Sequence, residues 1–169
     1  MSSENINKKL DRLIEEDDYY GVKNILQSHP EYKNYILGEA AAGGKRDLIN
    51  LALNYDADDI LYGIEQASLN CRVGVVKHLK NIAYQYGIKV TEDFLKDIVK
   101  NLVYCALNND RKDLITEITN NAKQLGVTGA YISSLVDQYY IERSIESYSS
   151  EEEPYEKKYP ELSSSSESD

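Results

Sequence analysis

The chain has 169 residues, 41% hydrophobic and 28% charged, which are the size and composition of one globular domain. Its formal net charge is −10, of which residues 144–169, with eight acidic and two basic side chains, carry −6. Nucleic-acid binding is therefore disfavoured, because an acidic chain repels a phosphate backbone. No apolar run approaches the roughly 18 residues of a membrane span and the start has no apolar leader, so we expect no membrane association and a cytoplasmic or nuclear location.

Two amphipathic helices are predicted at the N-terminal end of the chain. Apolar residues recur there at steps of three and four, the period of a helix with one buried face, and strand-like alternation is almost absent. These residues are Ile6, Leu10, Leu13 and Ile14, followed by Val22, Ile25 and Leu26. Pro30 interrupts the pattern, because the residue before a proline is pushed out of the helical region. Two further helices are predicted over about 33–42 and 46–54, with Gly43 and Gly44 turning the chain between them.

The segment 40–53 recurs in degenerate form further along the chain. Its sequence, AAAGGKRDLINLAL, aligns with ASLNCRVGVVKHLK at 67–80 and with ALNNDRKDLITEIT at 106–119. The three copies share an alanine, a basic residue and an aliphatic pair. These positions are Ala40, Ala67 and Ala106, then Lys45, Arg72 and Arg111, then Leu48-Ile49, Val75-Val76 and Leu114-Ile115. A weaker copy, IEEDDYYGVKNILQ at 14–27, puts Ile14 at the alanine position and Val22 at the first aliphatic position. It is the first of four copies in chain order, so the copy at 40–53 is the second. Constant spacing of this kind indicates a repeated structural unit.

Each copy predicts a helix, a tight turn and a second helix. The small residue on the first helix lets the second helix approach closely, and the aliphatic pair on the second helix fills the seam with the next unit. Asp47 and Asp113 begin the second helices, where a negative charge meets the positive end of the helix dipole. In the turns we expect positive φ at glycine or asparagine, the residues that tolerate it best. The candidates are Gly43, Gly44, Asn70, Asn108 and Asn109.

The second copy, AAAGGKRDLINLALNYDAD, resembles the ankyrin repeat, whose core pattern is A-A-x-x-G-H-x-x-V-V-x-x-L-L-x-x-G-A-D. The matching residues are Ala40, Ala41, Gly44, Leu48, Ile49, Ala52, Leu53, Ala57 and Asp58. Degenerate copies rich in Asn, Tyr and Ile are similar to the ankyrin-like proteins that large DNA viruses encode, which implies the host cytoplasm or nucleus as the location. No T-P-L-H opens a first helix, and the copies begin 26, 27 and 39 residues apart, at Ile14, Ala40, Ala67 and Ala106, instead of about 33. The resemblance covers about residues 5–125 and implies an irregular α-solenoid of paired helices.

The rest of the chain departs from the repeat at three places. The long interval holds an insertion, YQYGIKVTEDFLKD at 84–97, with a helical stretch of its own over about 91–99. A helix over about 129–145 is predicted to cap the stack with a polar outer face. The last residues hold Ser, Glu, Tyr and Pro with almost nothing aliphatic, and are predicted to be disordered. We therefore expect an all-α helical-repeat domain over 1–143 and a disordered acidic tail over 144–169.

Neither a catalytic nor a metal site is predicted. The two histidines are His29, before a proline in a loop, and His78, a packed or half-exposed position on the second helix of the third copy. No nucleophile elbow, zinc-protease motif or phosphate loop occurs. The segment 56–67 begins like a calcium loop, but apolar residues stand where its fifth ligand, its glycine and its last glutamate are needed. We therefore expect no enzyme activity, no cofactor and no bound metal.

The two cysteines, Cys71 and Cys105, lie 34 residues apart, without a Cys-x-x-Cys spacing and without a framework of further cysteines. Both fall in or next to the first helix of their copies. Free cysteine in an intracellular protein behaves as a small hydrophobe, so we expect two buried, reduced thiols.

These features favour a non-enzymatic protein–protein interaction scaffold that is a monomer and binds a partner protein through its exposed first-helix faces and loops. Tyrosine is rigid and amphipathic at interfaces, although an exposed tyrosine can equally be plain helix cover. Candidate contacts are Tyr19, Tyr20, Tyr32, Tyr35, Tyr55, Asp56, Asp58 and Asp59. The alternative is a structural role, for example in a virion, in which the stack associates end to end.

The tail offers candidate phosphorylation sites. Four serines lie just before acidic residues, the pattern that an acid-directed kinase prefers, and each phosphate would add about −1.5 to −2 charges. They are Ser149, Ser150, Ser164 and Ser166. A solubilising tail that nothing reads is the other interpretation.

Overall fold

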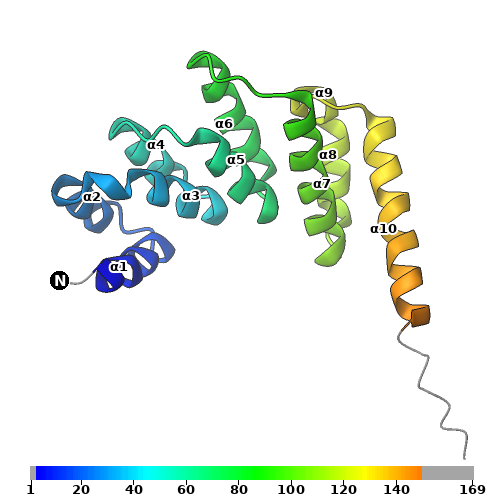
Figure 1. Cartoon of the computed structure of the whole chain (residues 1–169), viewed down its shortest axis with the longest axis horizontal. Helices are drawn as coiled ribbons and strands as arrows, with labels where there is room; N and C mark the ends of the chain where they lie inside the picture. Colours follow the sequence, from blue (N-terminus) through cyan, green and yellow to red (C-terminus); the bar gives the residue numbers. More distant parts are fainter. Residues whose placement is uncertain (1–2, 150–169) are drawn as a thin grey trace, which may run out of the picture.

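The computed structural model describes residues 3–149, and all the regular structure in that part of the chain is helical, as the sequence predicts (Figure 1). The first helices are α1 (Ser3–Glu15), α2 (Tyr19–Ser28), the short 3-10 helix η1 (Pro30–Tyr32), α3 (Lys33–Gly43), α4 (Arg46–Asn54), α5 (Ile60–Leu69) and α6 (Val73–Gln85). They are followed by α7 (Glu92–Asn108), α8 (Lys112–Asn120), α9 (Ala122–Leu125) and α10 (Gly129–Ser149). Within residues 3–149 no helix has the length and apolar character that crossing a membrane requires.

Side-chain caps fix where several helices begin. Asp18, Asp59 and Thr91 each accept a hydrogen bond from the backbone N–H three residues further on, at 2.9, 3.3 and 3.2 Å. These bonds satisfy N–H groups that have no partner inside the helix, so they stabilise the starts of α2, α5 and α7. Asp47 and Asp113 lie in the first turns of α4 and α8, as the sequence predicts.

Four turns between paired helices have the same geometry. In each, a residue with positive φ is followed by a backbone N–H that donates, at 2.8 Å, to a carbonyl five residues back. The positive-φ residues are Asp17, Gly44, Cys71 and Asp110. The donor and acceptor pairs are Asp18 and Leu13, Lys45 and Ala40, Arg72 and Ala67, and Arg111 and Ala106. This common hydrogen bond closes the end of each first helix and directs the chain into the second.

These turns correct two expectations. Positive φ falls on Gly44, as expected, but not on Asn70, Asn108 or Asn109; the neighbouring Cys71 and Asp110 adopt it instead. Asn70 and Asn109 are C-caps with negative φ, and Asn109 donates its side-chain amide to the carbonyl of Cys105. The first copy is also displaced by one residue from its expected alignment, because the turn hydrogen bond places Leu13, and not Ile14, at the alanine position.

The first helices of successive pairs pack on one another along the chain. Helix α1 contacts α3, α3 contacts α5, α5 contacts α7, and α10 covers α7 (Figure 1). Each first helix also packs on its own second helix, α1 on α2, α3 on α4, α5 on α6 and α7 on α8. Ala40, Ala67 and Ala106 are all fully buried where these helices meet. The small alanine side chain permits this close packing, which is the role that the sequence predicts for it.

Two helices differ from their predicted form. The helical stretch predicted over about 91–99 is present, but it is not a separate helix: α7 runs without a break from Glu92 to Asn108, so the extra residues lengthen the first helix of the fourth pair. Helix α10 continues to Ser149, so the predicted boundary at 143/144 falls inside a helix, and the remainder of the predicted tail lies outside the described residues. The outer face of α10 is not wholly polar, because Tyr140, Ile141 and Ile145 are exposed on it.

The cysteines are not free thiols. Cys71 and Cys105 form a disulfide whose Cα atoms are 5.7 Å apart, and both residues are half-buried. The expectation of two buried, reduced thiols is therefore wrong. The pairing escaped the sequence because 34 residues separate the cysteines, and only the packing of α5 on α7 brings the α5–α6 turn next to the end of α7.

Candidate functional site

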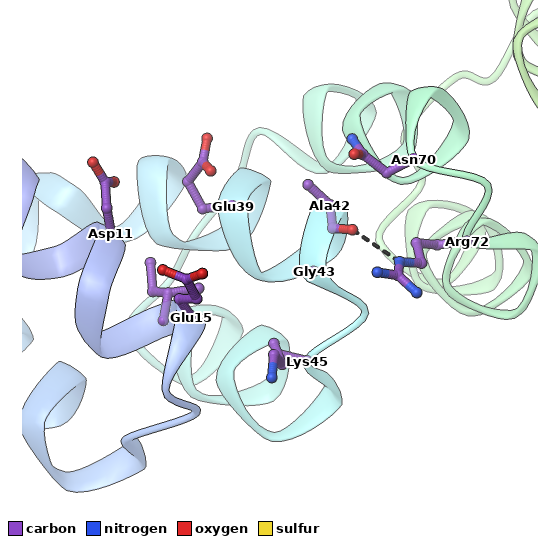
Figure 2. A pocket seen from close by; sticks show the side chains of 9 residues that line it. Asp11, Glu15, Glu39, Ala42, Gly43, Lys45, Asn70 and Arg72 are labelled. Atoms are coloured by element: carbon purple, nitrogen blue, oxygen red, sulfur yellow. Dashed lines mark hydrogen bonds between the residues drawn. The ribbon is translucent and has the colours of Figure 1, made fainter. Parts of the chain in front are cut away.

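A cavity of about 550 Å³ lies between α1, α3 and the turn that joins α5 to α6. Side chains of opposite charge line it from two sides, as Figure 2 shows. Asp11 and Glu15 of α1 and Glu39 of α3 form the acidic side, and Lys45 and Arg72, from the starts of α4 and α6, form the basic side. The cavity therefore carries both signs of charge within one concave surface.

The helices determine the acidic side. Asp11 and Glu15 are four residues apart, so they lie on the same face of α1. Tyr35, one turn before Glu39 on α3, donates its hydroxyl hydrogen to Asp11 Oδ1 and so ties α3 to α1 next to the cavity. Among the described residues, no lysine, arginine or histidine forms an ion pair with these three carboxylates. The acidic side is thus available to a positively charged ligand.

The environment changes the protonation of two groups on this side. Burial raises the pKa of Glu39, and the nearby charge of Asp11 raises it further. Burial also raises the pKa of Tyr35, to which its hydrogen bond with Asp11 adds. Both shifts arise because burial and the Asp11 charge disfavour a second negative charge. A cation that entered the cavity would offset this repulsion.

Arg72 fixes the basic side. Its Nε donates to the carbonyl oxygen of Ala42 at 3.0 Å, the bond drawn in Figure 2. This places the guanidinium at the C-terminal end of α3, where a positive charge interacts favourably with the helix dipole. Lys45 lies 3.9 Å from Asp17, at the edge of ion-pair distance. Gly44, with φ of 75°, makes the turn that brings Lys45 round to this face.

Ionisable groups of both signs line this cavity. Its ionisable groups are carboxylates, one lysine and one arginine, and neither histidine lines it. His29 lies near Glu31, with Nδ1 and Oε1 3.0 Å apart, and His78 is half-buried on α6. No group of three or more His, Cys, Asp or Glu residues within 3–149 is placed to hold a metal ion.

The structure divides the predicted contact residues among three places: η1 with α3, the start of α2, and the α4–α5 loop. Tyr32 and Tyr35 stack edge to face, with ring centroids 6.5 Å apart, and Tyr35 adjoins the charged cavity through Asp11. Tyr19 is half-buried against the core, whereas Tyr20 is 75% exposed beside it. The pair lies at the start of α2, so it is separate from the tyrosines of η1 and α3.

The remaining contact candidates stabilise the α4–α5 loop. The side chain of Asn34 accepts hydrogen bonds from the backbone N–H groups of Asp58 and Asp59, at 2.9 and 3.2 Å, and donates to Asp58 Oδ1 at 2.8 Å. Asp56 has positive φ, and Tyr55 is the half-buried cap residue of α4. Because these bonds and caps already occupy them, Asp58 and Asp59 have a structural function in the loop. The bond from Asn34 and the neighbouring Lys33 lower the pKa of Asp58.

Sequence reasoning missed most of the charged cavity. Lys45 and Arg72 were matched in the repeat alignment, yet that alignment did not show that they face a common space. Asp11 and Glu15 share a helix face, which is a signal available in the sequence, but the approach of Glu39 depends on how α3 packs on α1. Of the predicted phosphorylation sites, Ser149 is the last residue of α10, and Ser150, Ser164 and Ser166 lie outside the described residues.

The chain was compared with protein-family models, curated proteins and solved structures. The chain matches no protein-family model, no curated protein and no solved structure at a significant level.

Proposed function

We propose that this protein is a non-enzymatic protein–protein interaction scaffold, an irregular α-solenoid of ankyrin-like helix pairs. The proposal is supported by the recurrence of one turn geometry in four helix pairs and by the contacts of each first helix with the next. A row of such pairs presents an extended surface of turns and first helices, which is the form that repeat proteins use for binding. The ankyrin-like pattern of residues 40–58 supports the same proposal.

The partner docks at the charged cavity. The observation that carries this assignment is that Asp11, Glu15 and Glu39 face Arg72 and Lys45 across a single concave surface. Complementary charges of this kind select a partner and its orientation more than they add affinity. The ligand is therefore a segment of a partner protein that presents a basic side chain to α1 and α3 and an acidic one to the α5–α6 turn.

A selection from a displayed random-peptide library tests this assignment. The full chain should enrich peptides that contain both basic and acidic side chains. Neutralising the acidic side, by Asp11→Asn, Glu15→Gln and Glu39→Gln together, should weaken binding of the enriched peptides at least about tenfold. Removing charged interface partners commonly has effects of this size. The matched control neutralises three exposed acids away from the cavity, Glu65, Glu117 and Asp137, and should leave binding unchanged.

Helical content measured by circular dichroism should be equal in both variants, so that lost binding is not lost folding. Equal binding by the cavity variant and the control variant would show that the partner docks elsewhere. Affinity purification with the full chain beside a version that ends at Ser149 then separates partners of the described helices from partners of the remaining residues.

A second role, self-association in a structural assembly, is favoured by one observation. Tyr140, Ile141 and Ile145 are 55%, 60% and 63% exposed on α10, an unusual concentration of apolar surface on a terminal helix. If a second copy covers this surface, light scattering should show an oligomer that Ile141→Lys and Ile145→Lys convert to monomer. A monomer at all concentrations would remove this role.

A further inference from the structure

A second cavity, of about 590 Å³, lies beside the Cys71–Cys105 disulfide. Both cysteines line it, and neither residue is fully buried. The cavity is formed by the α5–α6 turn and the α7–α8 turn. A redox-inert structural disulfide is normally shielded within the core, whereas both residues of this one are half-buried and line an open cavity. The proposed scaffold function makes no use of this disulfide or its cavity.

Two arginines give this cavity a positive side. Arg72 and Arg111 both line it, each directly after a positive-φ residue at the end of a first helix. Arg111 shares its charge with Asp113, whose carboxylate lies 2.7 Å from Nη2, and the neighbouring Asp110 is an exposed acid. Within residues 3–149 no carboxylate lies at ion-pair distance from Arg72, whose Nε donates to the carbonyl of Ala42; Asp11, Glu15 and Glu39 face it only across the first cavity. Arg72 therefore contributes most of the uncompensated positive charge.

The two sulfur atoms have different surroundings. The side-chain Nδ2 of Asn109 lies 3.8 Å from Cys105 Sγ, within the range of an N–H···S hydrogen bond. Such a donor stabilises negative charge on sulfur, so Cys105 Sγ is the better leaving group. Cys71 Sγ has no such donor among the described hydrogen bonds and is the sulfur that an incoming thiolate attacks.

We propose that this cavity is a thiol-exchange site for low-molecular-weight thiols that carry carboxylate groups. The thiolate of the first molecule attacks Cys71 Sγ, a mixed disulfide forms on Cys71, the Cys71–Cys105 bond breaks, and its electron pair leaves on Cys105 Sγ. A second small-molecule thiolate then attacks the sulfur of the first small molecule in the mixed disulfide, and the thiolate of Cys71 leaves. Two thiols are thereby oxidised to their disulfide, and their two protons pass to the two cysteines.

The exchange changes how two helix pairs are joined. The disulfide connects the α5–α6 turn to α7, and the chain itself joins the same two pairs only through residues 86–91 at the other end of α6 and α7. After reduction, packing of α5 on α7 and a few side-chain hydrogen bonds hold the seam. The site therefore couples the thiol supply of the surroundings to the stiffness of the helix stack.

The charge selectivity of reduction tests the proposal. Cys71 and Cys105 are the only cysteines in the chain, so every thiol that a chromogenic reagent detects comes from this pair. The oxidised full chain is reduced with 3-mercaptopropionate, 2-mercaptoethanol or cysteamine, which are anionic, neutral and cationic, and each rate is expressed per thiolate. A small-molecule disulfide reduced by the same thiols supplies the intrinsic reactivities.

The anionic thiol should react at least about threefold faster than the cationic thiol, relative to that reference, since one guanidinium about 6 Å away in water has an effect of this size. In 0.5 M salt the preference should disappear, because the screening length shrinks to a few ångströms. Arg72→Gln should abolish most of the preference and Arg111→Gln less of it. Arg46→Gln is the matched control, because Arg46 is exposed but does not line the cavity.

Trapping with limiting anionic thiol, acid quenching and peptide mass spectrometry should find the adduct on Cys71. The proposal is overturned if air-oxidised protein keeps two free thiols per chain, if the charge preference equals that of the small-molecule disulfide, or if the adduct forms on Cys105. The salt dependence is measured on the unmodified chain, so it decides the question even where an arginine variant folds poorly.

Discussion

The seam between α3 and α5 and the seam between α5 and α7 join successive helix pairs by different means. The first combines close apolar packing, which depends on glycine, with hydrogen bonds from Arg72 Nε to the carbonyl of Ala42 and between Asn34 and Asp58. A Cβ placed on Gly38 would overlap the ring of Tyr62, and one on Gly63 would lie 3.1 Å from Leu79 Cδ1 and 3.3 Å from Leu37 Cγ. Because neither glycine has a side chain, the two helices approach closely, and their packed surfaces hold the seam.

The second seam is held by directional ties. The Cys71–Cys105 disulfide lies at one end of it, and about one helical turn away Asn101 donates to Ser68 Oγ at 3.2 Å. Two lysines of α6 reach the α8–α9 region: Lys77 donates to Asn121 Oδ1 and Lys80 to the carbonyl of Gln124, both at 2.6 Å. Lys80 is only 6% exposed, and burial lowers its pKa.

This difference follows the spacing of the repeats. The first seam joins copies 27 residues apart, and the second joins copies 39 residues apart, in which α6 and α7 are longer. The second seam adds two lysine hydrogen bonds and a covalent bond to its packing, whereas the first seam combines glycine-dependent close packing with hydrogen bonds of Arg72 and Asn34. The comparison teaches that successive helix pairs of one chain can be joined by close packing with hydrogen bonds, or by packing to which a covalent bond is added. Substitutions in each seam test what holds that seam together.

The largest effect is expected from the disulfide. Cys71→Ser with Cys105→Ser should lower the free energy of unfolding by about 3–4 kcal/mol, the loop-entropy value for a crosslink spanning 34 residues. The loss is measured by urea unfolding of the oxidised chain, the reduced chain and the double variant. The reduced chain and the double variant should agree. Unfolding at the same urea concentration in all three would show that the second seam does not depend on this bond.

Alanine at the seam glycines should have the next largest effect. Gly38→Ala and Gly63→Ala should each destabilise the chain by roughly 1–2 kcal/mol, because overpacking outweighs the better helix propensity of alanine. Gly74→Ala on α6 is the matched control, since its Cβ would meet only Arg46 Nη2, at 3.5 Å, and it should gain up to about 1 kcal/mol. Thermal unfolding followed by circular dichroism ranks the three. A Gly38→Ala variant as stable as Gly74→Ala would contradict close packing at the first seam.

A smaller loss is expected from the polar tie in the second seam. Ser68 is fully buried, and Ser68→Ala should cost about 1 kcal/mol because it leaves the Asn101 amide without this acceptor. Ser134→Ala, at an exposed position of α10, should change stability by less than about 0.5 kcal/mol. Chemical denaturation with a common slope compares them. Equal stability of the two variants would show that the hydrogen bond adds nothing to the seam.

The smallest effect concerns Glu39, near the first seam. The pKa of Glu39 is raised in the folded state, so the folded chain holds its proton more tightly than the unfolded chain does. The resulting contribution to the free energy of unfolding is present below about pH 4.5 and is lost as pH rises through the folded-state pKa. Glu39→Gln should therefore gain stability at pH 7, by less than about 1 kcal/mol because the group is largely solvated. The gain should vanish near pH 4. Glu65→Gln, exposed on α5, is the control, and a gain independent of pH would contradict this explanation.

Local patterns were enough to predict several elements, and the reason lies in neighbouring residues. Helix α4 has the predicted limits, Arg46 to Asn54, because Gly44 and the flanking aliphatic residues mark both ends of it. The exact position of positive φ was harder to predict. Asn70 and Cys71 are adjacent, and the position of the turn hydrogen bond to Ala67, not intrinsic preference, decides which one adopts it.

The chain order of polar and apolar residues by itself determined that this protein is helical, that its helices come in pairs, and that alanine and aliphatic side chains lie between them. These features depend on residues within about a dozen positions, where helix periodicity acts. Only the tertiary structure decided the Cys71–Cys105 bond and the meeting of Asp11 and Glu39 with Arg72. Such groups are distant in sequence, and the packing of one first helix on the next, which no local pattern specifies, brings them together.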